Sequence, residues 1–104
     1  MKPVNPSMQV SVRYFTRLRE IVGKREETLR FSDKETITIG TALEKLSRKH
    51  GKAFTEYVYD KKTGRPRSFL QFLVNGRGIP PDLETDSRLT DGDVMAIIPP
   101  VGGG

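Results

Sequence analysis

The sequence predicts an α+β fold in which a mixed sheet of four to five strands packs on one main helix. Three observations favour it. Stretches with apolar residues at every second position occur toward both ends of the chain, as half-buried strands require. One central stretch has apolar residues at helical spacing, and an Asn-Gly pair marks a tight hairpin turn. A length of 104 residues with 35% hydrophobic residues suits a single domain with one modest core.

The first two strands are predicted over residues 9–15 and 27–31. In the first strand the inward face is apolar, and it consists of Val10, Val12 and Tyr14. Phe15 falls on the opposite, polar face. A short turn or helix follows and ends at Gly23, since glycine readily adopts the left-handed conformation that ends helices. Two strands this close in sequence favour a hairpin-like pair.

The main helix is predicted over residues 39–50. Its apolar stripe has the spacing i, i+3, i+4 and i+7, and it consists of Ile39, Ala42, Leu43 and Leu46. Thr38 is a suitable N-cap, and Gly51 suits a left-handed stop. Residues 52–68 are less regular and indicate a short helix followed by a basic loop over residues 61–67.

Three further strands complete the expected sheet, over residues 69–74, 77–79 and 94–98. Asn75-Gly76 supplies the tight turn between the first two of them. Pro80-Pro81 and Pro99-Pro100 end the strands that precede them, because proline cannot donate a hydrogen bond to a neighbouring strand. The expected organisation is an N-terminal extension, a folded domain and a flexible C-terminal segment, over residues 1–7, 8–98 and 99–104.

The side chains offer no group with the chemistry of an active site. The chain has no cysteine, which excludes disulfides, thiolate metal sites and a cysteine nucleophile. His50, the only histidine, is expected to be a capping or surface residue. Asp91 and Asp93 flank a glycine, and the turn chemistry of aspartate explains them better than catalysis does. We therefore expect no catalytic residue and no metal site in the chain itself.

The formal charge of the chain is +5 and is unevenly spread. Residues 1–77 carry 17 basic and 8 acidic side chains, whereas residues 78–104 carry Arg88 against five acidic side chains. A basic face can meet nucleic acid or an acidic partner, but a solvated surface is the simpler interpretation. No apolar run approaches the ~20 residues that span a bilayer, and no signal peptide is evident. We expect a soluble, cytoplasmic protein without membrane contact.

The chain ends in three glycines, which have no side chains to pack. One interpretation is an end without a role, and the other is a bare Gly104 carboxylate on a thin, flexible stalk. Residues 99–104 reach about 20 Å when extended, at ~3.3–3.6 Å per residue. The residues that would thread a narrow enzyme channel are Pro99, Pro100, Val101, Gly102 and Gly103. The two prolines stiffen the exit, so that the segment projects.

A second feature also indicates a binding partner. The face of the sheet opposite the helix is expected to collect the apolar side chains of Phe15, Leu73, Val94, Ala96 and Ile98. An exposed apolar patch of this kind is typical of a docking surface. The alternative is that a loop or the segment over residues 52–68 covers it.

Four blocks of the sequence carry a family resemblance, and they run from Phe15 to Gly23, from Val74 to Gly76, from Leu89 to Val94 and from Pro99 to Gly104. In order and spacing they resemble the small subunit of molybdopterin synthase, which belongs with the thiamine-pathway sulfur carriers and the small archaeal modifier proteins. The resemblance covers residues 8–104. It implies a ubiquitin-like β-grasp fold.

The resemblance also implies a cycle in which partner proteins supply all the catalytic groups. An E1-like adenylyltransferase uses ATP and magnesium to adenylate the Gly104 carboxylate, and sulfur transfer then makes a thiocarboxylate. In the molybdopterin branch the C-terminal segment enters the large synthase subunit and gives sulfur to a pterin precursor. By the same resemblance Phe15, Arg19 and Ile98 contact partners. The chain itself is expected to bind no cofactor.

Several functions remain open at this point. Three of them share the activation step: a sulfur carrier for molybdenum cofactor synthesis, a protein modifier joined to target-protein lysines, and a sulfur carrier for tRNA thiolation. A fourth, from another class, is a basic RNA-binding module with an incidental C-terminal segment. We expect the carrier for molybdenum cofactor synthesis, with an E1-like adenylyltransferase and a large synthase subunit as partners, rather than a nucleic-acid-binding protein.

Overall fold

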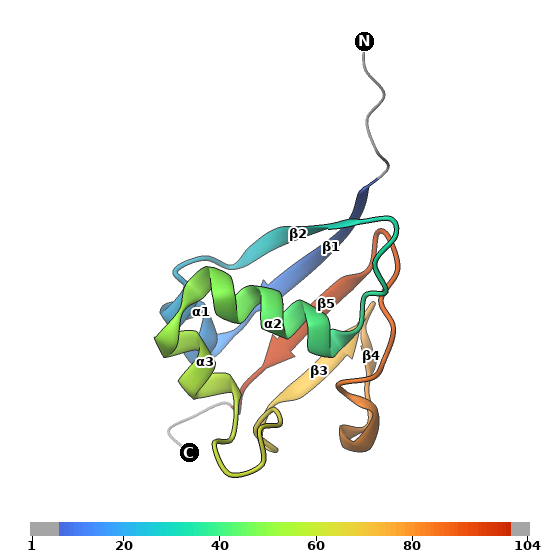
Figure 1. Ribbon diagram of the computed structural model, residues 1–104. Helices are drawn as coiled ribbons and strands as arrows, with labels where there is room; N and C mark the ends of the chain where they lie inside the picture. The colour runs from blue at the N-terminus through green and yellow to red at the C-terminus, as the bar shows by residue number, and fades with distance from the viewer. Residues whose placement is uncertain (1–6, 101–104) are drawn as a thin grey trace.

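The computed structural model describes residues 7–100 and shows one five-stranded mixed sheet (Figure 1). The strand order is β2-β1-β5-β3-β4. The strands are β1 (Ser7–Tyr14), β2 (Glu26–Ser32), β3 (Gln71–Val74), β4 (Arg77–Gly78) and β5 (Val94–Ile98). β1 and β5 are parallel, and every other neighbouring pair is antiparallel. The predicted α+β fold with a mixed sheet is therefore confirmed.

The helices are α1 (Thr16–Val22), α2 (Ile39–His50) and α3 (Lys52–Val58), with a short 3₁₀ helix over Pro81–Leu83. α2 has the predicted bounds because both of its ends are capped. The Thr38 hydroxyl accepts a hydrogen bond from the backbone N–H of Thr41, and the Thr41 hydroxyl accepts one from the N–H of Thr38. At the other end Gly51 has a φ of +84°, which disfavours a side chain.

The core lies between α2 and the sheet. The inward positions expected from alternation and from the helical stripe are buried, and they include Val10, Val12, Tyr14, Leu29, Ile39, Leu43, Leu46, Phe72, Met95 and Ile97. α1 and α3 extend this core with Leu18, Phe54 and Val58. Each such side chain contributes about 1.5–3 kcal/mol when fully buried. The position of α2 on one face leaves the other face of the sheet free of helices (Figure 1).

The hairpin between β3 and β4 forms at the predicted pair. Asn75 and Gly76 have φ angles of +53° and +83°, which are the left-handed angles that a two-residue hairpin turn needs. Gln9 to Tyr14 also pairs as expected, although β1 begins earlier, at Ser7. Among residues 7–100 no helix is both long enough and apolar enough to cross a membrane.

Gly40, in the first turn of α2, is packed too closely for any side chain. A Cβ added there would lie 2.9 Å from the carbonyl oxygen of Thr85, which already accepts a hydrogen bond from the Gly40 N–H at 3.1 Å. Gly40→Ala is therefore expected to lower the free energy of unfolding by about 1–3 kcal/mol, because the loop or the helix must shift. Urea denaturation measures this change.

The matched control is Arg48→Ala, at an exposed position of the same helix. We expect it to change the free energy of unfolding by less than ~0.5 kcal/mol. Alanine has the higher helix propensity by about 1 kcal/mol, so Gly40→Ala would be stabilising if the contact with Thr85 were unimportant. A stability equal to or above that of the unchanged chain would contradict the prediction.

Candidate functional site

The C-terminal segment leaves the domain from the middle of the sheet. β5 lies between β1 and β3 and ends at Ile98, beside α1 and α3 (Figure 1). Pro99 is buried and Pro100 is exposed, so the chain reaches the surface at Pro100. The predicted activation residue Gly104 and the threading residues Val101, Gly102 and Gly103 lie outside the described residues.

Beside this exit, the register of the strands brings the predicted apolar residues onto one face. Leu73 and Arg13 both lie opposite Ala96 on β5. Neighbouring residues in register point to the same side of a sheet, and alternate residues along β5 share a side. Leu73 therefore lies on the same face as the alternate residues of β5, and Phe15 adjoins them. We call this set the outer patch and define it as Phe15, Leu73, Val94, Ala96 and Ile98. Ala96 is only 9% exposed, and the other four are half-buried.

Phe15 is held on the outer face by the end of β1. Its backbone is extended, with φ −132° and ψ 154°, so it continues the alternation of the strand. The guanidinium of Arg13 lies 6.0 Å from the centre of the Phe15 ring, in the range of a cation–π contact. Thr16 then has a φ of +47°, which is uncommon for a β-branched residue. This turn starts α1 directly after the patch residue.

α3, the helix that follows α2, does not form a lid over the outer patch. α3 packs against α1 and α2, and it therefore lies on the helix side of the sheet. Arg19, the sixth residue expected to bind a partner, is on α1, where it lines a shallow cavity of about 310 Å³ with Glu20 and residues 23–25. The structure thus gathers five of the six expected residues on the sheet and places Arg19 on the adjoining helix.

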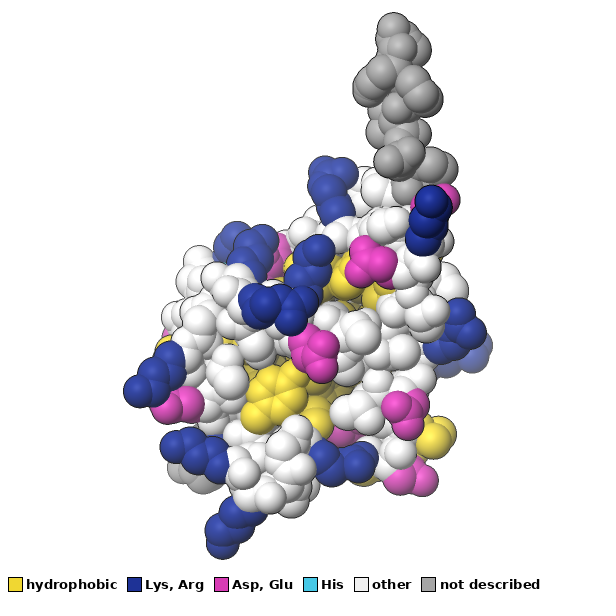
Figure 2. All heavy atoms as spheres, in the orientation of Figure 1, with side chains coloured by type: hydrophobic (Ala, Val, Ile, Leu, Met, Phe, Trp, Pro, Cys, Tyr) yellow, Lys and Arg dark blue, Asp and Glu magenta, His cyan; other side chains and the backbone are white. Residues whose placement is uncertain are grey.

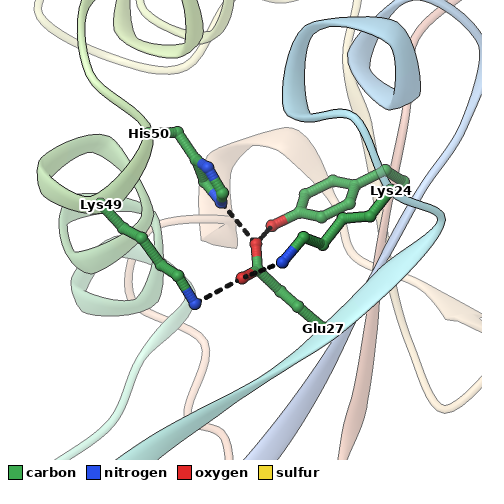
Figure 3. Close-up of polar contacts among 5 residues, drawn as sticks. Lys24, Glu27, Lys49 and His50 are labelled. Atoms are coloured by element: carbon green, nitrogen blue, oxygen red, sulfur yellow. Dashed lines mark hydrogen bonds and ion pairs between the residues drawn. The ribbon is translucent and has the colours of Figure 1, made fainter.

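A buried ionic cluster that the sequence analysis did not find lies on the opposite face of the sheet (Figure 3). Glu27 of β2 is at its centre, with a side chain only 4% exposed. Its Oε1 lies 2.7 Å from Nζ of Lys49, and its Oε2 lies 2.5 Å from Nε2 of His50. The hydroxyl of Tyr14 also donates a hydrogen bond to Oε2. Lys24 completes the cluster, with its Nζ 3.8 Å from Oε1.

These contacts decide the charge of Glu27. Burial alone would raise its pKa, but the contacts from Lys49, Tyr14 and His50 outweigh burial and lower the pKa to about 2. For Tyr14, burial first and the neighbouring Glu27 carboxylate second raise the pKa above its ordinary value. Glu27 is therefore ionised and Tyr14 protonated at neutral pH. The cluster joins β1, β2 and the end of α2.

The structure corrects the expectation for His50. Its side chain is 13% exposed and pairs with Glu27, so it is neither a cap nor a surface residue. The histidine ring also packs edge-on against Tyr14, with ring centres 6.3 Å apart. The sequence did contain a signal, because Glu27 has the same alternation as Leu29 and Phe31. A carboxylate on an apolar face needs partners.

The charged side chains on the helix side are dispersed. Figure 2 shows Lys and Arg side chains on this face lying among Asp and Glu side chains, with hydrophobic surface between them. This dispersion agrees with a solvated surface on the face shown. Among residues 7–100 no group of three or more His, Cys, Asp or Glu side chains is placed to hold a metal ion.

A mixed sheet with a parallel central pair, crossed on one face by a helix, defines a ubiquitin-like β-grasp domain. The last residues of such a chain follow its central strand. The chain belongs to the ThiS family, whose family model matches residues 12–104. The family resemblance and the β-grasp fold expected from the sequence are both confirmed.

Three relatives show the range of this similarity. Small archaeal modifier protein 3 of Haloferax volcanii is 29% identical over 97 residues, which are 93% of this chain and 100% of the relative. Small archaeal modifier protein 1 of Methanosarcina acetivorans has a TM-score of 0.74 at 27% identity, over 95% of this chain and 99% of that one. A structure described as molybdopterin converting factor, subunit 1, from Pyrococcus furiosus has a TM-score of 0.67 at 30% identity, over 90% and 99%. The chain is thus a member of a family of ubiquitin-like sulfur carriers and modifiers.

Proposed function

We propose that this chain is a sulfur carrier for molybdopterin synthesis, activated at the Gly104 carboxylate in the cytoplasm. The observation that carries the proposal is the position of β5. This central strand presents the outer patch along its length and continues directly into the C-terminal segment. A partner that docks on the outer patch therefore lies beside the exit of the segment it must receive. The similarity to the Pyrococcus furiosus structure supports the molybdopterin branch.

The activation chemistry needs only the carboxylate of this chain. An oxygen of the Gly104 carboxylate attacks the α-phosphorus of ATP, pyrophosphate leaves, and an acyl adenylate forms. A sulfur nucleophile at the oxidation level of sulfide then attacks the acyl carbon and displaces AMP, which leaves a thiocarboxylate. The activating enzyme binds ATP and magnesium. Because the sulfur stays attached to a docked protein, it reaches the acceptor at a high effective concentration.

The test is incubation of the intact chain with its cognate E1-like adenylyltransferase and ATP. We expect pyrophosphate release that depends on the chain, followed, with a sulfur donor, by the mass gain of an oxygen-to-sulfur exchange. Adding the large subunit of molybdopterin synthase and the pterin precursor should then consume the thiocarboxylate. Thiocarboxylate that persists in the presence of both would count against the molybdopterin branch.

A protein modifier is the second candidate, and the full-length similarity to small archaeal modifier protein 3 favours it. In this case a lysine amine of a target protein attacks the acyl carbon of the Gly104 adenylate. AMP leaves, and an isopeptide bond forms. Trypsin cleaves after lysine and arginine, so digestion of proteins from the host would then leave the branch from Leu89 to Gly104 on lysines of other proteins. A sulfur carrier for tRNA thiolation would instead lose its sulfur to tRNA in the same assay format.

Leu73→Glu should impair activation, because it places a charge in the outer patch where a partner must exclude water. We expect kcat/KM for adenylation to fall about 10- to 100-fold, in line with the loss of a residue at the centre of an interface. The pyrophosphate assay measures the change. Leu73 is half-buried on β3 and contributes no core side chain, so the variant should fold.

Thr28→Glu is the matched control for this prediction. Thr28 is exposed on the same face of the sheet, on β2, and β1 separates it from β5. We expect this variant to keep most of the activity of the unchanged chain. Equal rates for the two variants would show that partners do not dock on the outer patch.

A further inference from the structure

A second cavity lies at the other end of the sheet from the C-terminal segment. Its volume is about 540 Å³, within the range of small-molecule sites. It is lined by Val74, Asn75, Arg77, Ile79, Ser87 and Arg88. Val74 pairs with Met95 near the start of β5, whereas the C-terminal segment follows Ile98 at its end. The cavity therefore lies at the other end of β5 from the point where the C-terminal segment leaves the sheet.

Most polar groups around the cavity already have partners. The Asn75 amide donates to Oδ1 of Asp93 at 2.9 Å, and its carbonyl oxygen accepts from the N–H of Val94 at 2.9 Å. The Ser87 hydroxyl donates to the Leu83 carbonyl at 2.8 Å. Neither group is left to bind a ligand strongly.

The nearby start of α2 is also satisfied. The N–H of Ile39 donates to the carbonyl of Ser87 at 2.9 Å, and the N–H of Gly40 donates to that of Thr85 at 3.1 Å. Unlike these groups, the guanidinium groups of Arg77 and Arg88 have no ionic partner, because no carboxylate among residues 7–100 lies within ion-pair distance of either. Arg77 and Arg88 are thus the two charged residues of the cavity lining, and neither has a carboxylate partner among residues 7–100.

Two positive charges that line one cavity repel each other, and an anion between them removes the repulsion. Each guanidinium offers a planar fork that fits the oxygens of a carboxylate or a phosphate. Arg77 lies opposite Val74 in the β3–β4 register, so both point to the same side of the sheet. Val74 and Ile79 thus provide an apolar surface beside the charges.

We propose that this cavity binds a small organic anion, with its carboxylate or phosphate group between Arg77 and Arg88 and its apolar body against Val74 and Ile79. Such a site is separate from the C-terminal chemistry and does not depend on the proposed carrier function. It would let a metabolite bind without blocking the outer patch.

The test is a titration of the full chain followed by the backbone amide signals of the cavity residues in NMR spectra. The probes are phenyl phosphate, benzoate, inorganic phosphate and benzyl alcohol. We expect saturable shifts with phenyl phosphate or benzoate, and the tighter of the two identifies the anionic group. Inorganic phosphate lacks the apolar body and benzyl alcohol lacks the charge, so both should bind at least about tenfold more weakly.

Arg77→Gln and Arg88→Gln should each weaken the preferred probe about tenfold or more, since each removes a charged hydrogen-bond donor. Arg30→Gln is the control, because Arg30 is an exposed arginine of β2 that does not line the cavity. Absence of saturable shifts with every probe would overturn the proposal. Equal weakening by Arg30→Gln would also overturn it, because the attraction would then come from the overall charge.

Discussion

A chain that lacks Gly103 and Gly104 should release no pyrophosphate with the activating enzyme, although it folds like the intact chain. The truncation moves the terminal carboxylate two residues closer to Pro100, where the chain reaches the surface. A shortened segment cannot bring its carboxylate to an active site that is spaced for the full length. The buried residues of the described structure end at Pro99, and glycine has no side chain to pack against them. We expect the free energy of unfolding to change by less than ~0.5 kcal/mol.

Two further chains separate the position of the carboxylate from its surroundings. Gly104→Ala keeps the carboxylate in place and adds one methyl group. We expect a partial loss of pyrophosphate release, and its size depends on the width of the partner's channel. An alanine appended after Gly104 moves the carboxylate outward, and its activity should be as low as that of the truncated chain. Pyrophosphate release by the truncated chain at the rate of the intact chain would show that activation does not depend on the position of the Gly104 carboxylate, and it would end the proposal.

The same truncation tests the RNA-binding alternative. An RNA-binding module would use the basic side chains of residues 1–77, and these are unchanged by loss of the last two glycines. Its affinity for RNA should then be equal with and without the truncation, and it should fall steeply with salt. A sulfur carrier or a protein modifier would instead lose its activity when the last two glycines are removed.

Local signals predicted most of the elements correctly. Thr38 and Gly51 set the two ends of α2, and Asn75-Gly76 sets the turn of the hairpin. Each of these signals depends only on the backbone angles of the residue itself and on hydrogen bonds to residues nearby in the sequence. The pairing of β1 with β5 is different. It joins residues at opposite ends of the chain, and alternation shows only which side of a strand is buried, not which strand lies beside it.

The outer patch could be predicted because it depends on alternation within single strands. The ionic cluster could not be assembled in the same way, since Tyr14, Glu27 and His50 come from three different elements. The cavity between Arg77 and Arg88 also escaped prediction, because its two sides come from the hairpin and from an irregular segment. Clusters made across loops leave no periodic trace in a sequence.

Glu27 should be the charged residue on which stability depends most. Glu27→Ala leaves the Tyr14 hydroxyl and the His50 ring without their shared partner inside the protein, and each buried polar group left unpaired costs about 1–3 kcal/mol. Urea denaturation at pH 7 measures the loss. Glu26→Ala is the matched control on the same strand, because its side chain is 66% exposed and its contact with Arg13 is 3.7 Å long. An exposed pair of this kind contributes about 0–1 kcal/mol.

The free energy of unfolding should fall as the pH is lowered below about 4.5. The pKa of Glu27 falls from an ordinary 4.5 to about 2 on folding, so the folded state favours the ionised form. Its contribution to stability is therefore complete above about pH 4.5 and is lost as the pH falls toward 2. Asp93 also has a lowered pKa, since hydrogen bonds from Thr90 and Asn75 outweigh the effect of burial, and it adds to the same acid sensitivity.

Glu27→Gln isolates the contribution of Glu27, because the amide keeps the size of the side chain and does not titrate. The difference in free energy of unfolding between the unchanged chain and Glu27→Gln should be largest near neutral pH and shrink between pH 4.5 and pH 2, while the Asp93 contribution cancels. A difference that stays constant across this range would mean that the cluster stabilises the fold by packing and hydrogen bonding alone. The carboxylate charge of Glu27 would then have no part in holding α2 against the sheet.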